Sequence, residues 1–169
     1  MKLKINKLSL TFKRLIILLF FMFFFLFSLS GFVFASNDNL DLQSKSVVLM
    51  ENKTNKILYD KNSTGKMFPA STTKIVTAIL VLEHCNLNDV VTADAESVST
   101  IPEGYVTANI TADEQFTVEQ LLELLLVHSA NDSANILAKY VAGSIDNFVS
   151  MMNEKANNLK LKNTHFTNT

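Results

Sequence analysis

The sequence predicts an α/β fold in which a short antiparallel hairpin leads into a lobe of apolar helices. Two runs of β-branched and apolar residues flank a polar turn between residues 46 and 59. After residue 70, apolar residues recur at helical spacing in several segments, most of them next to capping or stop residues. Residues 1–35 differ from the rest, being first basic and then strongly apolar. We therefore expect residues 36–169 to form one domain or part of a larger one, preceded by a targeting segment.

The amino terminus has the layout of an export signal. Residues 1–14 contain five cations and no acid, residues 15–27 are an apolar run, and Ala35 precedes a polar stretch. We expect cleavage after Ala35. An uncleaved anchor is the alternative, because residues 15–35 are long enough to cross a bilayer. Either way we expect residues 36–169 outside the cytoplasm, in the cell wall or at the outer face of the membrane, with membrane contact only through signal or anchor segments.

The composition of residues 36–169 excludes some partners. Nine of the 13 Phe lie before residue 36, and the remainder carries 10 Lys against 16 Asp and Glu, a net charge of −6. No basic stripe is present, which argues against nucleic-acid binding. Cys85 is the only cysteine, so no internal disulfide can form, and we expect it to be a small, buried or half-buried apolar group.

The first predicted elements are two strands and a helix. Residues 46–50 and 56–59 form the hairpin, and Asn55 suits a turn position with positive φ. Residues 71–84 read as a helix that is apolar over most of its circumference, which predicts burial on all sides. The stretch after it, 86–116, reads as irregular with short strands at 90–92 and 105–110.

Three further helices follow. Thr117 and Gln120 have the spacing of a capping box, which starts a helix through the leucine run to residue 127. Asp132 is the expected cap of the next helix, which ends at Gly143. Ser144 is the expected cap of a helix reaching about residue 158, and the last residues, 162–169, read as extended.

The most informative motif is Ser71-Thr72-Thr73-Lys74. Residues three apart on a helix share a face, so the hydroxyl of Ser71 and the amine of Lys74 can meet. A neutral amine in contact with a hydroxyl is one way to make serine nucleophilic. The pattern is common by chance, so its context has to support this interpretation.

A second motif, Ser129-Ala130-Asn131, follows 58 residues after Ser71, in a break between two apolar helices. A tight turn there can direct a hydroxyl and a carboxamide into a cleft, where the hydroxyl relays a proton and the carboxamide holds a substrate amide. Taken alone, the motif is equally an ordinary loop, since Ser and Asn are favoured in turns and at helix caps.

Taken together, the motifs and their surroundings resemble a known family, the serine-type D-alanyl-D-alanine carboxypeptidases (low-molecular-mass penicillin-binding proteins, peptidase family S11). The resemblance covers nearly all of residues 40–169 and includes P-A-S-T-T-K-I-V-T-A, F-T-V-E-Q-L-L and S-A-N-D. It implies a β-lactamase/transpeptidase-like fold with a helical lobe and an antiparallel sheet. Ser-x-x-Lys, a second serine triplet and Lys-Thr-Gly are the signature of that superfamily.

The resemblance also implies roles for the motif residues. Ser71 would be the nucleophile, Lys74 would accept its proton, Ser129 would pass a proton to the leaving D-alanine, and Asn131 would bind the substrate peptide. The implied partners are peptidoglycan stem peptides ending in D-Ala-D-Ala, with β-lactams as covalent inhibitors. No cofactor or metal is implied, and the three histidines are too scattered to predict a metal site (His84, His128 and His165).

The sequence departs from the family pattern at two points. Ala130 replaces the glycine common in the second motif, a mild change. No Lys-Thr-Gly occurs in the 169 residues. We therefore interpret residues 36–169 as the amino-terminal portion of the catalytic domain, truncated before the third-motif strand and inactive or nearly so. The alternatives are an exported non-catalytic protein that binds cell-wall peptides and a serine β-lactamase.

Overall fold

The computed structural model describes residues 10–28 and 40–169, and the chain divides into two units, residues 1–44 and 45–169. In the first unit, α1 (Leu10–Ser28) is a helix that includes the predicted apolar run. The predicted cleavage position after Ala35 lies outside the described residues. Within the described ranges, no helix combines the length and the apolar character that crossing a bilayer requires.

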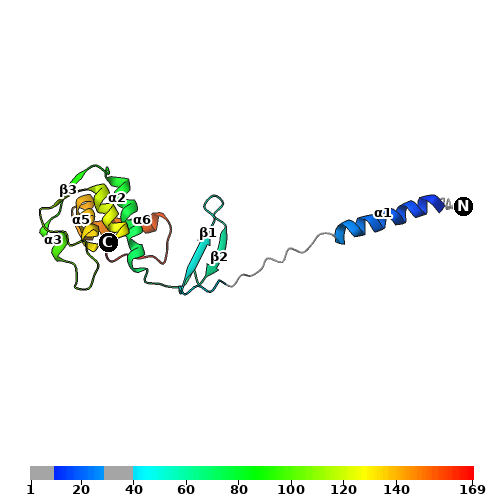
Figure 1. The fold of residues 1–169 in the computed structure, drawn as a ribbon, viewed down its shortest axis with the longest axis horizontal. Coiled ribbons are helices and arrows are strands. Elements are labelled where there is room, and N and C mark those ends of the chain that lie inside the picture. The colour runs from blue at the N-terminus through cyan, green and yellow to red at the C-terminus, as the bar shows by residue number, and fades with distance from the viewer. Residues whose placement is uncertain (1–9, 29–39) are drawn as a thin grey trace. The chain divides into compact units, whose positions relative to one another are not determined.

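The predicted hairpin is present at the start of the second unit. Strands β1 (Val47–Met50) and β2 (Ile57–Lys61) pair in antiparallel fashion, with an irregularity next to Met50 (Figure 1). Asn55 in the turn has a φ of 56°, which confirms the positive value expected from its residue type.

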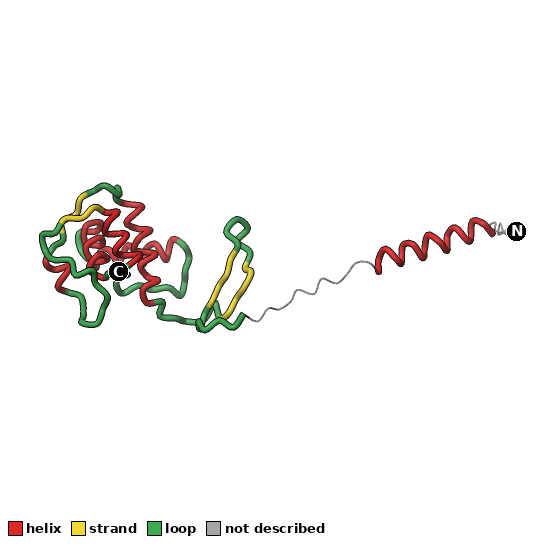
Figure 2. The backbone as a smooth tube through the Cα atoms, in the orientation of Figure 1, coloured by secondary structure: helices red, strands yellow, loops and turns green. Residues whose placement is uncertain are grey.

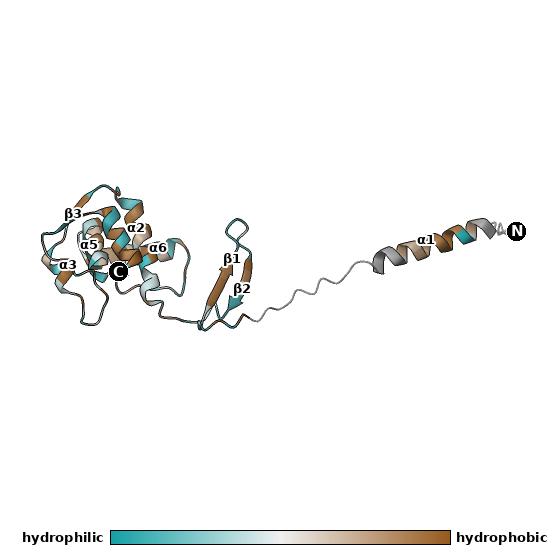
Figure 3. Ribbon diagram, viewed as in Figure 1, coloured by the Kyte–Doolittle hydropathy of each residue, from teal (hydrophilic) through white to brown (hydrophobic). Residues whose placement is uncertain are grey.

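The hairpin is rich in apolar residues: Figure 3 colours β1 and the first part of β2 brown, and the end of β2 teal. Along each strand, successive side chains point to opposite faces of the hairpin. Leu49 in β1 and Leu58 in β2 are nevertheless 53% and 55% exposed. Strands β1 and β2 pack on each other, and neither is among the described elements that pack extensively on a helix. The hairpin therefore leaves both of its apolar faces uncovered in the described structure.

The rest of the unit is a helical lobe (Figure 2). Its long helices are α2 (Lys74–His84), α4 (Val118–Val127), α5 (Asn131–Ala142) and α6 (Ile145–Asn158). Helix α5 packs against the other three and against the short helix α3 (Ala95–Ser99). The core lies around α5, and its largest fully buried apolar side chains are Leu121, Leu125, Ile136, Leu137, Phe148 and Met152.

Helix α2 differs from its prediction in two ways. It begins at Lys74 because residues Ala70–Thr73 form a turn of 3₁₀-helix, η1, in place of a first α-helical turn. The prediction that α2 is buried on all sides was wrong, since Ile75 and Leu82 are each 56% exposed. Only one face of α2 packs on α4, α5 and α6, so its opposite apolar face stays open.

Most of the predicted helix boundaries are confirmed. Thr117 and Gln120 form a capping box in which each side chain accepts a hydrogen bond from the other residue's backbone. Gly143 ends α5 with a φ of 77°, and Ser144 caps α6 by accepting a hydrogen bond from the amide of Asn147. These caps are predictable because all of their partners lie within one helical turn.

The prediction that Asp132 caps α5 was wrong. The capping position belongs to Ala130, and Asp132 lies inside the first turn. Its carboxylate is turned towards the backbone of residues 108–110. The amides of Ala108 and Ile110 both donate to that carboxylate, which explains why the predicted strand at 105–110 is also wrong.

Other parts of the irregular stretch are partly as predicted. Strand β3 (Val90–Thr92) is present, but its antiparallel partner is β4 (Gln115–Thr117). Residues 162–169 form no strand with any described residue. Instead, the backbone N–H and carbonyl of Phe166 bond the side chain of Asn153 on α6.

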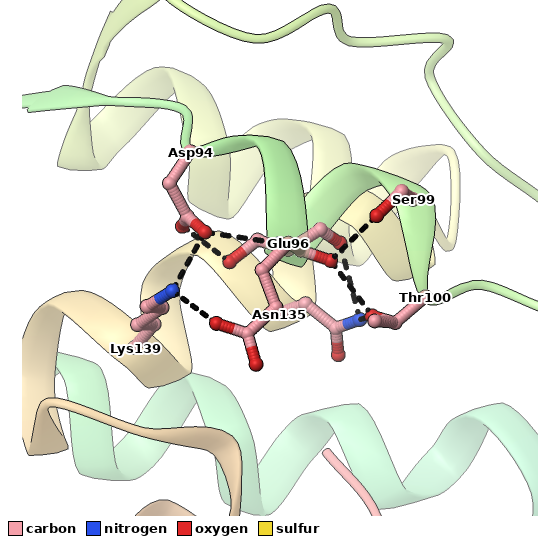
Figure 4. Close-up of polar contacts among 7 residues, drawn as sticks. Asp94, Glu96, Ser99, Thr100, Asn135 and Lys139 are labelled. Carbon is pink, nitrogen blue, oxygen red and sulfur yellow. Dashed lines mark hydrogen bonds and ion pairs between the residues drawn. The ribbon is translucent and has the colours of Figure 1, made fainter.

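An ion-pair cluster fastens α3 to α5 (Figure 4). Nζ of Lys139 lies 2.7 Å from the carboxylate of Asp94 and 2.6 Å from that of Glu96. On the same side of α5, Nδ2 of Asn135 donates to the carbonyl of Ser97 at 3.3 Å. Burial acts to raise the pKa of Asp94, but the hydrogen bonds from Lys139 and Ser97 together outweigh it and lower the pKa to about 2.

Candidate active site

The site begins at the turn before α2, where Ser71 is exposed at the surface. Pro69 and Ala70 lead into this turn, and Ala70 has a φ of 49°, an unfavourable conformation for a residue with a Cβ atom. The hydroxyl of Thr72 donates to the carbonyl of Pro69 at 2.8 Å and steadies the turn. The chain thereby presents Ser71 to solvent directly before a helix fixed by the core.

Lys74 lies one turn further along and is buried, with 4% of its surface exposed. Burial lowers the pKa of its amine, because a charged ammonium loses hydration there. Nζ donates a hydrogen bond of 3.0 Å to Oδ1 of Asn131, at the start of α5. The contact made by Lys74 is therefore with Asn131 on another helix, whereas helical spacing alone predicts a contact with Ser71.

Ser129 occupies the break between α4 and α5, with a φ of 59°. This left-handed conformation reverses the chain after α4, and the amide of Ala130 then bonds the carbonyl of Leu124 at 3.1 Å. The turn brings the hydroxyl of Ser129 to 2.8 Å from that of Ser71. The two motifs, 58 residues apart in sequence, thus meet through their serines.

Asn131 is held from two sides. Its backbone N–H and its Nδ2 both donate to the carbonyl of Val106, at 2.9 and 2.8 Å, while its Oδ1 accepts from Lys74. The segment around Val106 was not predicted to contribute to the site. Its only sequence signal is a polar, glycine-containing stretch between the two motifs, which does not indicate where the segment folds.

The structure brings all four predicted site residues together, as two bonded pairs: Ser71 with Ser129, and Lys74 with Asn131. The arrangement combines an exposed pair of hydroxyls with a buried amine, one helical turn after Ser71, whose pKa is lowered by burial. Such a set can support nucleophilic attack by a serine with proton transfer through its neighbours. Among the described residues, no group of His, Cys, Asp or Glu is arranged to hold a metal ion.

Sequence comparison identifies similar proteins. A family model described as D-alanyl-D-alanine carboxypeptidase matches residues 33–169. The D-alanyl-D-alanine carboxypeptidase DacF of Bacillus subtilis (strain 168) is 37% identical over 128 residues, which cover 75% of this chain and 33% of that protein. A D-alanyl-D-alanine carboxypeptidase of Streptomyces sp. (strain K15) is 38% identical over 130 residues, covering 69% of this chain and 43% of that protein.

Solved structures with the same fold include proteins of the same kind. The D-alanyl-D-alanine carboxypeptidase DacD from Francisella tularensis superposes with a TM-score of 0.70 at 30% identity, over 77% of this chain and 32% of that one. Penicillin binding protein 6B from Escherichia coli gives 0.68 at 33% identity, over 73% and 41%. The chain spans about a third of the first of these relatives in each comparison. The predicted β-lactamase/transpeptidase-like fold is thereby confirmed for the part that the chain contains.

Proposed function

Because the chain belongs to the D-alanyl-D-alanine carboxypeptidase family, as its motifs predicted, we propose that it supplies the nucleophile for removing a terminal D-alanine from peptidoglycan stem peptides. The observation that carries this proposal is the 2.8 Å contact between the hydroxyls of Ser71 and Ser129, with Lys74 buried three residues after Ser71. The proposal concerns the whole protein, of which these residues contain the first two motifs.

The reaction passes through an ester on Ser71. Its Oγ attacks the carbonyl carbon between the two D-alanines to give a tetrahedral oxyanion, which collapses to the ester as the peptide C–N bond breaks. The proton lost by the hydroxyl goes to the nitrogen of the departing D-alanine. Water then attacks the ester, releases the shortened peptide and returns a proton to Ser71. A β-lactam acylates the same oxygen by opening its ring.

Lys74 and Ser129 divide the proton transfer between them. The lowered pKa of Lys74 supports its role as the first acceptor, since more of the amine is neutral at a given pH. Ser129 touches Ser71 directly, which supports its role in delivering the proton to the leaving group. The left-handed turn at Ser129 sets the direction of its hydroxyl, so this relay is positioned before substrate binds.

Asn131 is suited to bind the substrate peptide while it orients Lys74. A carboxamide has two acceptor sites on its oxygen and two N–H groups. Lys74 takes one acceptor site and Val106 takes one N–H. The second acceptor site and the second N–H correspond to the two hydrogen-bonding groups of a peptide bond.

We propose further that residues 36–169 alone react slowly or not at all. The sequence contains no Lys-Thr-Gly, which the superfamily signature includes. The chain also spans about a third of its curated relative from Bacillus subtilis. The two signature motifs present supply the nucleophile, whereas the third would bind the substrate carboxylate and complete the oxyanion hole.

Fluorescent penicillin followed by intact-mass measurement tests these proposals. Residues 36–169 and the complete gene product are each incubated with the label, together with Ser71→Ala and Ser99→Ala variants. We expect one adduct on the complete product and on Ser99→Ala, a control at an exposed serine of α3, and none on Ser71→Ala.

The outcomes separate the alternatives. Stoichiometric labelling of residues 36–169 contradicts the proposed inactivity of this portion. Labelling of Ser71→Ala, or none on the complete product, overturns the nucleophile and favours a non-catalytic protein that binds cell-wall peptides. Rapid release of hydrolysed penicillin identifies a β-lactamase.

We also propose that the domain works outside the cytoplasm. The basic and apolar segments of residues 1–27 support this, together with a substrate that belongs to the cell wall. Fractionation of cells that express the gene, with sequencing of the amino terminus, tests it. We expect an extracytoplasmic protein that begins at Ser36, and a cytoplasmic protein that retains Met1 contradicts the proposal.

A further inference from the structure

Asp132 is a buried carboxylate that the proposed chemistry does not use. It is 2% exposed, and its oxygens accept from the amides of Ala108, Ile110 and Ser133 at 2.9 to 3.0 Å. Among the ion pairs of the described residues, none includes Asp132. Its charge is balanced by backbone N–H groups and by the amino end of α5.

A carboxylate in such a place needs a reason, because removing an ionised group from water is costly unless hydrogen bonds replace its hydration. Ala138 and Leu137 on the same helix show that apolar side chains fill the surrounding core readily. An apolar residue, however, cannot accept hydrogen bonds from two backbone amides of a segment without secondary structure. The feature specific to Asp132 is therefore its hold on the amides of Ala108 and Ile110.

The segment that Asp132 holds also holds Asn131. Two residues before Ala108, the carbonyl of Val106 accepts from both the backbone N–H and Nδ2 of Asn131. Asn131 in turn accepts from Nζ of Lys74. The hydrogen bonds of Asp132 are thus connected, through the backbone of residues 106–110, to the hydrogen bonds that hold Asn131 and Lys74.

We propose that Asp132 is a positioning residue for acylation: it clamps residues 106–110 onto the start of α5, and so fixes the carboxamide of Asn131 and the amine of Lys74. This inference rests on the proposed function. Asp132 itself touches neither Ser71 nor the reacting atoms. Its contribution is to keep the carbonyl of Val106 in place before substrate binds, where a shift of about 1 Å is enough to slow an enzyme substantially.

Asp132→Asn separates the clamp from simple packing, because the two side chains have nearly the same shape. The carboxamide replaces one acceptor oxygen with a donor NH₂, so only one of its two positions can accept. If its oxygen takes the Oδ2 position facing Ala108 and Ile110, its NH₂ faces the amides of Ala108 and Ser133, donor against donor. Ser133→Ala is the matched control. Ser133 is the next residue and fully buried, and its hydroxyl donates to the carbonyl of Leu121, away from residues 106–110.

The first measurement is hydrogen exchange in the complete gene product, read by mass spectrometry on peptides that span residues 105–111. We expect Asp132→Asn to speed exchange there by roughly tenfold or more, and Ser133→Ala to leave it unchanged. Unchanged exchange in Asp132→Asn overturns the clamp. This readout does not depend on any reaction with penicillin.

The second measurement is a double-mutant cycle on the rate of penicillin acylation. We expect Asp132→Asn to slow acylation by roughly tenfold to a hundredfold in the parent and by less than about threefold in an Asn131→Ala background, because its effect passes through Asn131. An equal loss in both backgrounds indicates a general structural role and overturns the proposal. A parent that does not react refutes the proposed function, while the exchange result still decides whether the clamp exists.

Discussion

Nζ of Lys74 donates a hydrogen bond to Oδ1 of Asn131 over 3.0 Å, which joins the start of α2 to the start of α5. The bond connects the first motif to the second at a partly buried position, while the Ser71–Ser129 contact connects them at the surface. The partly buried pair therefore sets the geometry, and the exposed pair is where a substrate can react. Lys74 occupies this position at a cost, because burial opposes its charged form.

That cost predicts how stability depends on pH. The pKa of Lys74 in the folded protein lies below 10.5, its ordinary value. Between the two values the unfolded chain binds the proton and the folded chain does not, so stability rises with pH in this window. We expect Lys74→Met to lack this rise, so the parent should gain stability relative to the variant as pH increases towards 10.5. Urea unfolding of both proteins at several pH values measures the difference, and a difference independent of pH contradicts the prediction.

The contact between Ser71 and Ser129 predicts a second result. Ser129→Ala keeps the nucleophile but removes the proposed relay, so we expect penicillin acylation to slow by roughly 10²- to 10⁴-fold in the complete gene product. Lys74→Ala should nearly abolish it. Stopped-flow fluorescence measures the rates, and thermal unfolding confirms that the variants are folded. Ser150→Ala, which removes an exposed hydroxyl on α6, is the control. An unchanged rate in Ser129→Ala excludes the relay.

The elements that the sequence predicted correctly depend on local partners. The capping box of Thr117 and Gln120 and the left-handed Gly143 involve bonds within a few residues, so the pattern contains all the information needed. The strand at 105–110 failed for the opposite reason. Its alternating apolar residues fit a strand, but its amides and carbonyl are bound by the side chains of Asp132 and Asn131, about 25 positions away.

The site shows the same division. The spacing of Ser71 and Lys74 identified both residues, and the second motif identified Ser129 and Asn131. The contacts among these residues could not be predicted. Helical spacing favours a contact between Ser71 and Lys74, whereas the packing of α2 on α5 places Lys74 in contact with Asn131. The exposed face of α2 was missed because hydropathy records how apolar a helix is, and not which elements cover it.

The cluster on α3 predicts a response to acid. The pKa of Asp94 is about 2 in the folded protein, against 3.8 ordinarily. A lowered carboxyl pKa contributes stability that is complete above the ordinary value and is lost as pH falls through the folded one. Because Asp94 is partly exposed, we expect the contribution to be only about 0.5–1 kcal/mol. Asp94→Asn keeps a good capping residue for α3 and removes the charge.

Urea unfolding of the parent and Asp94→Asn at pH 7, 4 and 2.5 measures this contribution. The parent should be the more stable at pH 7, and the two should converge towards pH 2. Asp89→Asn provides the matched control, since the carboxylate of Asp89 accepts from the amide of Asn86 in a turn outside the Lys139 cluster. A gap that persists undiminished at pH 2.5 means that the charge of Asp94 is not its source.

The turn that carries Ser71 holds strain that one substitution should relieve. Ala70 has a φ of 49°, where an alanine costs roughly 1 kcal/mol and a glycine almost nothing. Glycine also makes the unfolded chain more flexible, which offsets part of the gain. We therefore expect Ala70→Gly to raise the free energy of unfolding by a few tenths of a kcal/mol. Ala95→Gly, in the first turn of α3, should lower it instead, since that position is helical. Urea titrations of both variants test the prediction. The two substitutions make the same chemical change at exposed positions with different backbone conformations. A loss of stability in Ala70→Gly as large as that in Ala95→Gly therefore contradicts the prediction.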